Sequence, residues 1–316
     1  NNCTEQEAKI ELQKVWDSRL HVSMHNAKFD LAVATEKLGL PMLPWWLVHD
    51  TMVLAYLVDP HAKKIGLKEL AASRLGLPPT ERDEVHEWLI AYGIERRGTK
   101  RWGRSISKAP GNVVAPYAIG DTDRTKLILE SLLPEVQEAG MQGAYDRERQ
   151  LIPILLCNEQ EGITVDLERL EADIKVYDAA LTKVDGLLFK KLKASEFNLD
   201  SDEELADVID RAFPGLSWPM TPGGKRSTSK DSLAQVIGSL VPDLVALFTY
   251  RATLNTCVNT FMRPWMLVAQ QTGGRIHTEW NSVAQSEGAG TRTGRLSCSP
   301  NLQNFPMLKY AGFVYV

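Results

Sequence analysis

Cysteine and histidine are too few and too scattered in this sequence to form a metal-binding framework. Only four cysteines occur in 316 residues, at positions 3, 157, 257 and 298, and no two of them form a CxxC pair. The six histidines, at positions 21, 25, 49, 61, 86 and 277, show no zinc-ligand spacing either. This scarcity excludes a zinc ribbon and a disulfide-stapled secreted domain, so we expect reduced thiols and a cytoplasmic location.

Long apolar runs and an excess of positive charge are also missing. No stretch approaches the roughly 20 apolar residues of a membrane-spanning helix, and the opening residues NNCTEQEAKIEL show no signal peptide. We therefore expect no membrane association. The formal net charge is −4, so nucleic-acid binding would have to rest on local basic patches. The apolar share of 44% and the charged share of 24% are typical of folded proteins, and the length allows two or three domains.

The order of the predicted elements divides the chain near residue 135. Before this point helices alternate with short strands, which predicts an α/β domain, and beyond it the periodicity is mostly helical. Thr4 with Glu7 and Ser201 with Glu204 form capping boxes, and the first predicts a helix to about Trp16. Further helices are expected at residues 30–39, 66–76, 117–133, 147–162, 163–194, 231–240 and 244–262, and strands at 20–26 and 275–283.

Two short acidic motifs lie in the α/β part. HNAKFD places Asn26 and Asp30 four residues apart at a strand-to-helix junction, and YAIGD places Tyr117 and Asp121 four residues apart at a predicted helix start. Residues i and i+4 share one face of a helix, so Tyr117 and Asp121 could address the same metal ion or water. The alternative is structural, with Asp30 as a helix cap and Tyr117 as a core residue whose hydroxyl is satisfied.

A basic loop, TPGGKRSTSK, lies between two predicted helices of the second part. It is not a nucleotide-binding P-loop, because Pro219 stands where that pattern needs glycine and Arg226 follows the lysine. Its lysines and hydroxyls could grip a phosphate backbone, which makes Lys225, Ser227 and Thr228 candidate DNA-binding residues. A solvated hairpin between helices is the equally acceptable alternative.

The stretch TRTGRLSCSPNLQNFP, at Thr291–Pro306, is rich in hydrogen-bond donors and has no carboxylate or histidine. It resembles the TGRLSS…PNLQNIP signature of the family A, polymerase I-like DNA polymerases. RQLIPILLCNEQEGITVD, FNLDSDEELADVI, LFTYRATLNTCVNTF and GGRIHTEWNSV resemble further segments of that family, in the same order. HNAKFD and YAIGD resemble the second and third motifs of its 3′–5′ proofreading exonuclease. The longer SEGAGTRTGRLS segment is more similar to phage polymerases.

The resemblance implies an α/β, ribonuclease H-like exonuclease domain, then a mainly helical thumb and the first part of an α+β palm. The implied bounds are residues 1–135 for the exonuclease domain, 136–165 for the first palm helix and entry to the thumb, 166–262 for the thumb, and 263–316 for the start of the palm. The implied activity is that of a DNA-directed DNA polymerase with proofreading, which belongs in a bacterial cell or a phage-infected host.

Roles for individual residues follow from the same resemblance. Asp30 and Asp121 are implied as metal ligands, Tyr117 as the residue that orients the attacking water, and Asn26 and Phe29 as substrate-positioning residues. Arg295 is implied as a hydrogen-bond donor in the minor groove at the primer terminus, where base-edge acceptors are similarly placed for all pairs. The other DNA-binding residues implied are Arg251, Thr291, Asn301, Gln303 and Asn304.

The implied cofactor is Mg²⁺ or Mn²⁺, and the implied partners are primer-template DNA, deoxynucleoside triphosphates and accessory replication proteins. Three departures stand against the resemblance. The segment between Arg295 and Pro300 is one residue shorter than the family form, and Asn255 and Cys257 stand where relatives often carry lysine. The third is that neither carboxylate set is complete: no Asp-x-Glu precedes HNAKFD, and the polymerase aspartates are absent after AGFVYV.

Incomplete carboxylate sets lead to the expectation of a piece of a longer chain, cut at both ends, that holds DNA without doing chemistry. One alternative is a stand-alone 3′–5′ exonuclease with a helical nucleic-acid-binding domain, which leaves the Thr291–Pro306 stretch without a purpose. Another is a non-catalytic module that binds primer-template DNA.

Overall fold

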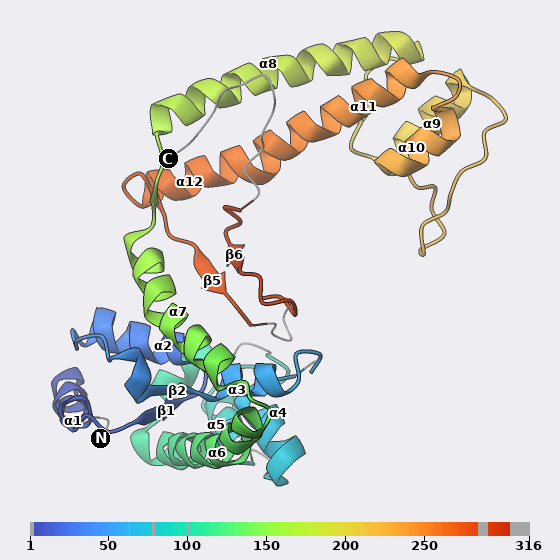
Figure 1. The fold of residues 1–316 in the computed structure, drawn as a ribbon. Helices are drawn as coiled ribbons and strands as arrows, with labels where there is room; N and C mark the ends of the chain where they lie inside the picture. The colour runs from blue at the N-terminus through green and yellow to red at the C-terminus, as the bar shows by residue number, and fades with distance from the viewer. Residues whose placement is uncertain (1–2, 63, 78–79, 100–101, 284–289, 304–316) are drawn as a thin grey trace. The chain divides into compact units, whose positions relative to one another are not determined.

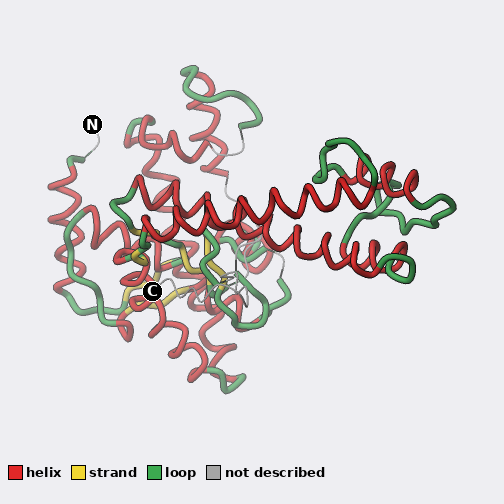
Figure 2. The backbone as a smooth tube through the Cα atoms, turned by 90° about the horizontal axis from the view of Figure 1, so that it is seen from above, coloured by secondary structure: helices red, strands yellow, loops and turns green. Residues whose placement is uncertain are grey.

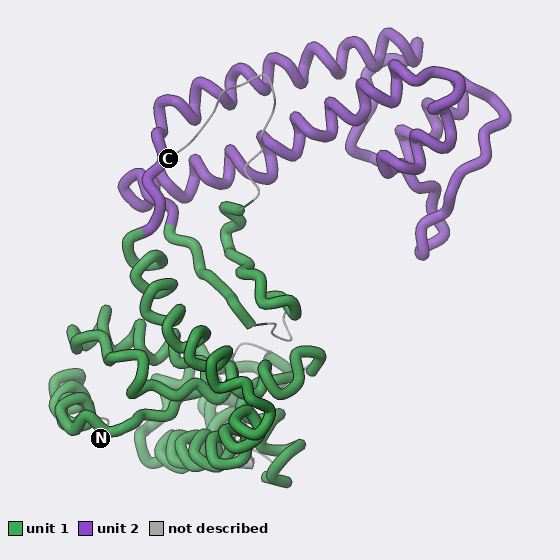
Figure 3. The backbone as a smooth tube through the Cα atoms, viewed as in Figure 1, with its two compact units in different colours: residues 1–161, 277–303 green, residues 162–276, 304–316 purple. Residues whose placement is uncertain are grey.

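The computed structural model describes residues 3–62, 64–77, 80–99, 102–283 and 290–303. The chain separates into two compact units, shown in different colours in Figure 3: unit 1 comprises residues 1–161 and 277–303, and unit 2 comprises residues 162–276 and 304–316. Within the described ranges, no helix is both long and apolar enough to cross a membrane.

Unit 1 combines a short parallel strand pair with a set of helices (Figure 1). Its regular elements are α1 (Glu5–Asp17), β1 (Val22–Met24), α2 (Ala27–Ala32), β2 (Val48–Asp50), α3 (Thr51–Val58), α4 (Leu67–Leu70), α5 (Thr80–Ala91), α6 (Gly111–Glu138), α7 (Gln142–Glu161), β5 (Glu279–Asn281) and β6 (Ser297–Ser299). Strands β1 and β2 pair in parallel, with Val22 opposite Val48 and Met24 opposite Asp50. The alternation of strand and helix predicted for this part is confirmed, although each strand has only three residues.

The core of unit 1 forms where α3 packs along α6. The sequence of α3, TMVLAYLV, has no charge, and its first six residues are buried. Helix α6 contributes Ile128, Leu132 and Val136, which are fully buried and recur every four residues, so one face of the helix enters the core. Tyr145 of α7 completes the cluster. This packing fixes β2, which runs directly into α3, against α7.

Two helices of unit 1 begin earlier than the sequence predicts. Helix α2 begins at Ala27, so Asp30 lies one turn inside it and is not its cap. Helix α6 begins at Gly111 and keeps Pro116 within it, so the expected start at Tyr117 is wrong. A proline inside a helix removes one backbone hydrogen bond, which made the first turns of α6 look non-helical. Helices α3 and α5 were not predicted.

A small lobe, residues 80–110, connects α4 to α6. It comprises α5 and a 3₁₀ segment, Trp102–Lys108. Val85, Leu89, Trp102 and Ala109 form its buried core, and Tyr117 of α6 packs against them. We call this part the insert lobe.

Strands β5 and β6 form an antiparallel pair at the end of unit 1, with Glu279 opposite Ser299 and Asn281 opposite Ser297. The predicted strand at residues 275–283 is therefore only partly correct. It is broken between β4 (Arg275–Ile276), which belongs to unit 2, and β5.

Unit 2 is built on long helices, which Figure 2 shows in red, side by side along part of their length. Its elements are β3 (Ile163–Thr164), α8 (Leu167–Leu192), α9 (Asp202–Ala212), α10 (Lys230–Ile237), α11 (Pro242–Asn255), a π-helical stretch (Thr256–Met262), α12 (Arg263–Gln271) and β4. Helix α8 packs along α11 and α12, and α9 and α10 lie at one end of this pair (Figure 1). The predicted helix at 244–262 thus begins at Pro242 and continues to Gln271.

Candidate functional site

A cavity of about 560 Å³ in unit 1 brings both acidic motifs together. Asp30 of α2 and Asp121 of α6 line it, although they are far apart in the sequence. The rest of the wall is mainly apolar, and the other lining residues are Leu12, Val15, Trp16, Val22, Ser23, Met24, His25, Phe29, Val33, Ala34, Leu38, Leu67, Thr122 and Thr125. We call this cavity the acidic pocket.

One side of the acidic pocket is made by α2. Phe29 is 65% exposed there, a large apolar ring that faces solvent next to a carboxylate. Burial by the surrounding side chains, together with the negative charge of Asp50, raises the pKa of Asp30 to about 6. At neutral pH the Asp30 carboxyl is mostly ionised, and its raised pKa means that a bound cation would stabilise it.

Asp50 fixes the start of α2, and sequence reasoning missed it. Its buried carboxylate accepts hydrogen bonds from the backbone N–H groups of Asn26 at 3.1 Å and Ala27 at 2.8 Å. It also caps α3 by accepting from Met52 N–H at 2.8 Å. The signal available was an aspartate directly before an apolar run, which is typical of an N-cap. One side chain therefore sets the ends of two helices, including the one that carries Asp30.

The opposite side of the acidic pocket is made by α6. Lys68 of α4 donates hydrogen bonds to both Tyr117 Oη, at 3.0 Å, and the Asp121 carboxylate. Arg124, one turn further along α6, approaches Asp121 with a nitrogen–oxygen distance of 3.6 Å. Tyr117 and Asp121 thus lie on one face of α6, as their i, i+4 spacing predicts, and Lys68 bridges their side chains. Lys68 was not predicted, because its partners come from a helix distant in sequence.

The acidic pocket offers the right donor type for a hard divalent cation but too few donors. Carboxylate oxygens are the ligands that Mg²⁺ and Mn²⁺ prefer. Of the described carboxylates, only Asp30 and Asp121 line the pocket, and Asp121 is already paired with cations. Among the described residues, no group of three or more acidic, histidine or cysteine side chains could hold a metal ion. The residues present do not by themselves fit a metal pair.

Asn26 does not join the acidic pocket. It adopts a left-handed backbone conformation, φ 66°, which asparagine tolerates better than most residues. It lines a separate, small cavity together with Lys28, Asp50 and residues of β5. Lys28 on the same helix binds Glu159 of α7 and the carbonyl of Trp280 in β5. This side of α2 therefore joins it to α7 and β5, while Phe29 and Asp30 face the acidic pocket.

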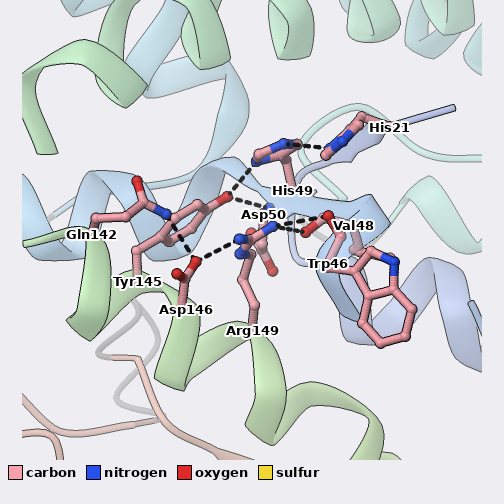
Figure 4. A network of polar contacts seen from close by, with 9 residues as sticks. All are labelled: His21, Trp46, Val48, His49, Asp50, Gln142, Tyr145, Asp146 and Arg149. Carbon is pink, nitrogen blue, oxygen red and sulfur yellow. Dashed lines mark hydrogen bonds and ion pairs between the residues drawn. The ribbon is translucent and has the colours of Figure 1, made fainter. Parts of the chain in front are cut away.

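A buried polar network, drawn in Figure 4, ties α7 to β2. Tyr145 Oη accepts from the Asp50 N–H at 3.1 Å and lies 3.1 Å from His49 Nδ1. Arg149 donates to the Val48 carbonyl at 3.2 Å and to Asp146 at 2.5 Å, and its guanidinium stacks over the Tyr145 ring. The network holds Asp50 and β2 against α7.

The β5–β6 pair presents the donors expected at a primer terminus. Arg295 lies exposed in the turn that leads into β6, and Thr291 closes this turn by donating to the Arg295 carbonyl at 2.5 Å. Asn301 and Gln303 are also exposed. Asn304 lies outside the described residues. The hydroxyl of Thr291 is thus engaged within the turn, whereas the side chains of Arg295 and Gln303 face solvent.

Arg251 in unit 2 has partners other than the expected phosphates. Its guanidinium is buried and bonds Asp185 and Asp200, each at 2.7 Å. A contact between Arg251 and a DNA backbone stays a prediction. Arg251 has a structural role, because its guanidinium links α8 and α11 to the segment before α9.

In the basic loop of unit 2, most polar side chains bond to residues of the neighbouring helices α9 and α10. Arg226 pairs with Asp207 and Asp210, and Thr228 donates to Asp202. Ser227 Oγ accepts from Ser232 Oγ at 2.8 Å. Lys225 and Lys230 are exposed, and their ammonium groups form no ion pair within the described part of the chain.

Two family models match successive parts of the chain. The model of the 3′–5′ exonuclease matches residues 2–137, and that of DNA polymerase family A matches residues 167–313. The first part of the chain is thus similar to 3′–5′ exonuclease domains and the second part to family A DNA polymerases. It is 28% identical to DNA polymerase I of Treponema pallidum over 96% of the chain and 28% of that protein.

Phage proteins are among the other relatives. The chain is 26% identical to DNA polymerase DpoZ of Vibrio phage phiVC8, over 89% of the chain and 46% of that protein. It is 25% identical to the DNA polymerase of Escherichia phage T5, over 97% of the chain and 36% of that protein. The chain therefore spans less than half the length of these relatives.

A solved structure shares the fold. The POL domain of Pol1 from M. smegmatis, in complex with a DNA primer-template and dNTP, aligns with a TM-score of 0.63 and 21% identity. The alignment covers 89% of this chain and 42% of the solved chain. The fold is thus that of an exonuclease domain followed by polymerase elements.

Proposed function

We propose that this chain is the part of a proofreading DNA polymerase that holds primer-template DNA and contributes one side of the 3′–5′ exonuclease site. The observation that carries the proposal is that Asp30 and Asp121 line one pocket, with Tyr117 one helical turn from Asp121. The primer-template and dNTP bound by the M. smegmatis neighbour support DNA as the ligand.

The domain assignment follows the predicted bounds. Residues 1–135 form a ribonuclease H-like exonuclease domain, 136–165 the first palm helix and entry to the thumb, 166–262 the thumb, and 263–316 the start of the palm. The helix pair of α8 with α11 and α12 supports the thumb assignment, since it ends in a loop-rich tip that carries exposed Lys225 and Lys230.

The chemistry proposed for the acidic pocket is phosphodiester hydrolysis. Asp30 and Asp121 would supply two oxygen donors to Mg²⁺ or Mn²⁺, and a metal pair would need more carboxylates than the described lining holds. Tyr117 would orient the attacking water, and the hydrogen bond that its hydroxyl accepts from Lys68, which also binds Asp121, supports this role. Phe29 offers a stacking face for a terminal base, and the α2 turn formed by Asn26 positions it.

The polymerase side rests on the turn before β6. Arg295 and Gln303 are exposed donors that can reach minor-groove acceptors common to all base pairs, with Asn301 beside them. The match of the polymerase family over residues 167–313 favours this function over a stand-alone exonuclease, which would have no use for these donors.

Replacing the exposed lysines Lys225 and Lys230 by neutral residues tests whether this part of the chain binds the DNA backbone. The double variant Lys225→Gln/Lys230→Gln is expected to bind primer-template DNA more weakly, because a surface with two fewer cations displaces fewer counterions from the DNA. The slope of log K against log salt should become shallower by roughly 0.9 for each phosphate that is no longer neutralised. The measurement is fluorescence anisotropy of a labelled primer-template at several salt concentrations.

The matched control is Lys14→Gln, which removes an exposed lysine of α1 that pairs with Glu11. It should leave the slope unchanged. An unchanged slope in the double variant, or weaker binding that depends on the DNA sequence, would rule out a backbone contact by these lysines.

A further inference from the structure

The insert lobe carries a concentration of positive charge that the proposed function does not use. Residues 96–108 contain six basic residues and no acidic one, in a chain whose net charge is −4. The six are Arg96, Arg97, Lys100, Arg101, Arg104 and Lys108. Lys100 and Arg101 lie outside the described residues. A run of one sign on this scale in an acidic protein is a candidate anion-binding surface.

The described part of this basic run is anchored and presented outward. Trp102 is buried in the lobe core and stacks on His86, with ring centroids 4.9 Å apart. Ser105 is also buried and donates to Glu95 at 2.5 Å, which engages the adjacent carboxylate. These contacts hold the backbone of the run in a defined path, so its charged side chains project from a formed surface.

The charges themselves remain available to a ligand. Arg96, Arg104 and Lys108 are exposed, and within the described residues they form no ion pair. Arg97 pairs with Glu87 at 2.8 Å, but both side chains are more than half exposed, so the pair is weak. Three basic side chains therefore face solvent without an ion pair among the described residues, and a fourth, Arg97, has only a weak one.

An exposed aromatic side chain precedes the run by four residues in the sequence. Tyr92, at the end of α5, is 67% exposed and stacks on Trp88 with ring centroids 4.2 Å apart. A rigid aromatic face beside cations is the combination by which proteins hold single strands, because unpaired bases stack and phosphates meet the charges. A duplex keeps its base faces covered and has no use for such a ring.

The insert lobe also borders the wall of the acidic pocket. Val113, Val114 and Tyr117 of α6 pack against the lobe core. Lys68 bonds both Tyr117 and the pocket carboxylate Asp121. A strand held on the lobe would therefore lie on the element that carries one side of the pocket.

We propose that the insert lobe is a binding surface for single-stranded DNA, in which Arg96, Arg104 and Lys108 hold phosphates and Tyr92 stacks on a base. The surface receives an unpaired strand next to the acidic pocket, without sequence preference. The proposal rests on the proposed function in taking the acidic pocket as part of the exonuclease site. Binding of single-stranded DNA to the lobe can be measured independently of that assignment.

The test compares a labelled oligo-dT with a labelled primer-template, both by anisotropy over a salt series. The triple variant Arg96→Gln/Arg104→Gln/Lys108→Gln should lower the oligo-dT salt slope by about 2, since each phosphate neutralised on a single strand contributes roughly 0.7. Tyr92→Ala should bind oligo-dT roughly tenfold more weakly, and Tyr92→Phe, which keeps the ring, should bind like the wild type.

The controls separate this inference from the proposed function. Lys14→Gln/Lys126→Gln/Lys175→Gln removes three exposed lysines that each lie near a glutamate on their own helix, and should leave oligo-dT binding unchanged. If the lobe variants bind oligo-dT like the wild type, or if their duplex binding weakens as much as their single-strand binding, the inference fails while the proposed function stands. If the wild-type chain binds neither DNA, both fail.

Discussion

Replacing Asp50 by alanine is expected to lower the free energy of unfolding of unit 1 by about 3 kcal/mol. The substitution removes the caps of two helices, each worth roughly 0.5–2 kcal/mol. It also leaves buried N–H groups of Asn26, Ala27 and Met52 without their acceptor, at about 1–3 kcal/mol for each that finds no new partner. Both descriptions refer to the same lost hydrogen bonds and are not added, so the expected loss of about 3 kcal/mol lies toward the upper end for two caps.

The measurement is thermal unfolding together with hydrogen exchange resolved by segment. Exchange should accelerate most in α2 and α3, because the Asp50 carboxylate holds both helix starts. Asp59→Ala is the matched control: Asp59 is exposed and accepts a bond from His61 N–H at 2.9 Å. Equal stabilities for Asp50→Ala and Asp59→Ala would refute the double-cap assignment.

Acid is expected to destabilise unit 1 through His49 well before general acid unfolding. Burial, followed by the positive charges of Arg149 and His21, lowers the pKa of His49 to about 4. Because Tyr145 Oη accepts from the Asp50 N–H, its own hydrogen is free to bond the neutral His49 Nδ1, 3.1 Å away. Protonation of Nδ1 removes this acceptor and places a charge in the network of Figure 4.

The direction of the stability change with pH follows from the pKa of His49 in the folded and unfolded states. The unfolded histidine has a pKa of about 6.5, so stability from His49 is complete above that pH and is lost as pH falls toward 4. Burial also lowers the pKa of His25, which adds to this destabilisation. Asp30 acts in the opposite sense: its pKa is raised to about 6, so its contribution is present at low pH and is lost as pH rises through 6.

The melting temperature should therefore be measured from pH 7.5 to 4.5 for the wild type, His49→Gln and Asp30→Asn. His49→Gln is expected to show the flattest decline, because a glutamine does not titrate. Asp30→Asn should decline more steeply than the wild type, because it lacks the opposing carboxyl. The assignment is wrong if His49→Gln declines as steeply as the wild type.

Local signals allowed part of the fold and site to be predicted. The Thr4–Glu7 capping box sets the start of α1, as expected, because capping depends on near neighbours in sequence. The i, i+4 spacing correctly placed Tyr117 and Asp121 on one helix face, even though the helix start was wrong. The Thr291–Pro306 stretch indicated the polymerase family, and HNAKFD and YAIGD indicated its exonuclease; the family models confirm both resemblances.

Contacts between distant segments could not be predicted in this way. Lys68 bonds Tyr117 and Asp121 only because α4 packs against α6, and no periodicity encodes that partnership. The same holds for Arg251, whose two aspartate partners come from α8 and the segment before α9. The DNA contact predicted for Arg251 stays a prediction, and its two ion pairs show in addition that it joins separate elements of unit 2.

The most direct test of the account uses the purified 316-residue chain with a labelled primer-template, Mg²⁺ and the four deoxynucleotides. A metal pair needs several carboxylates to balance its charge and fix its geometry, and of the described carboxylates only Asp30 and Asp121 line the acidic pocket. We expect salt-dependent binding of the primer-template without shortening of the primer. Shortening above a mock preparation, or an absence of binding, would contradict this.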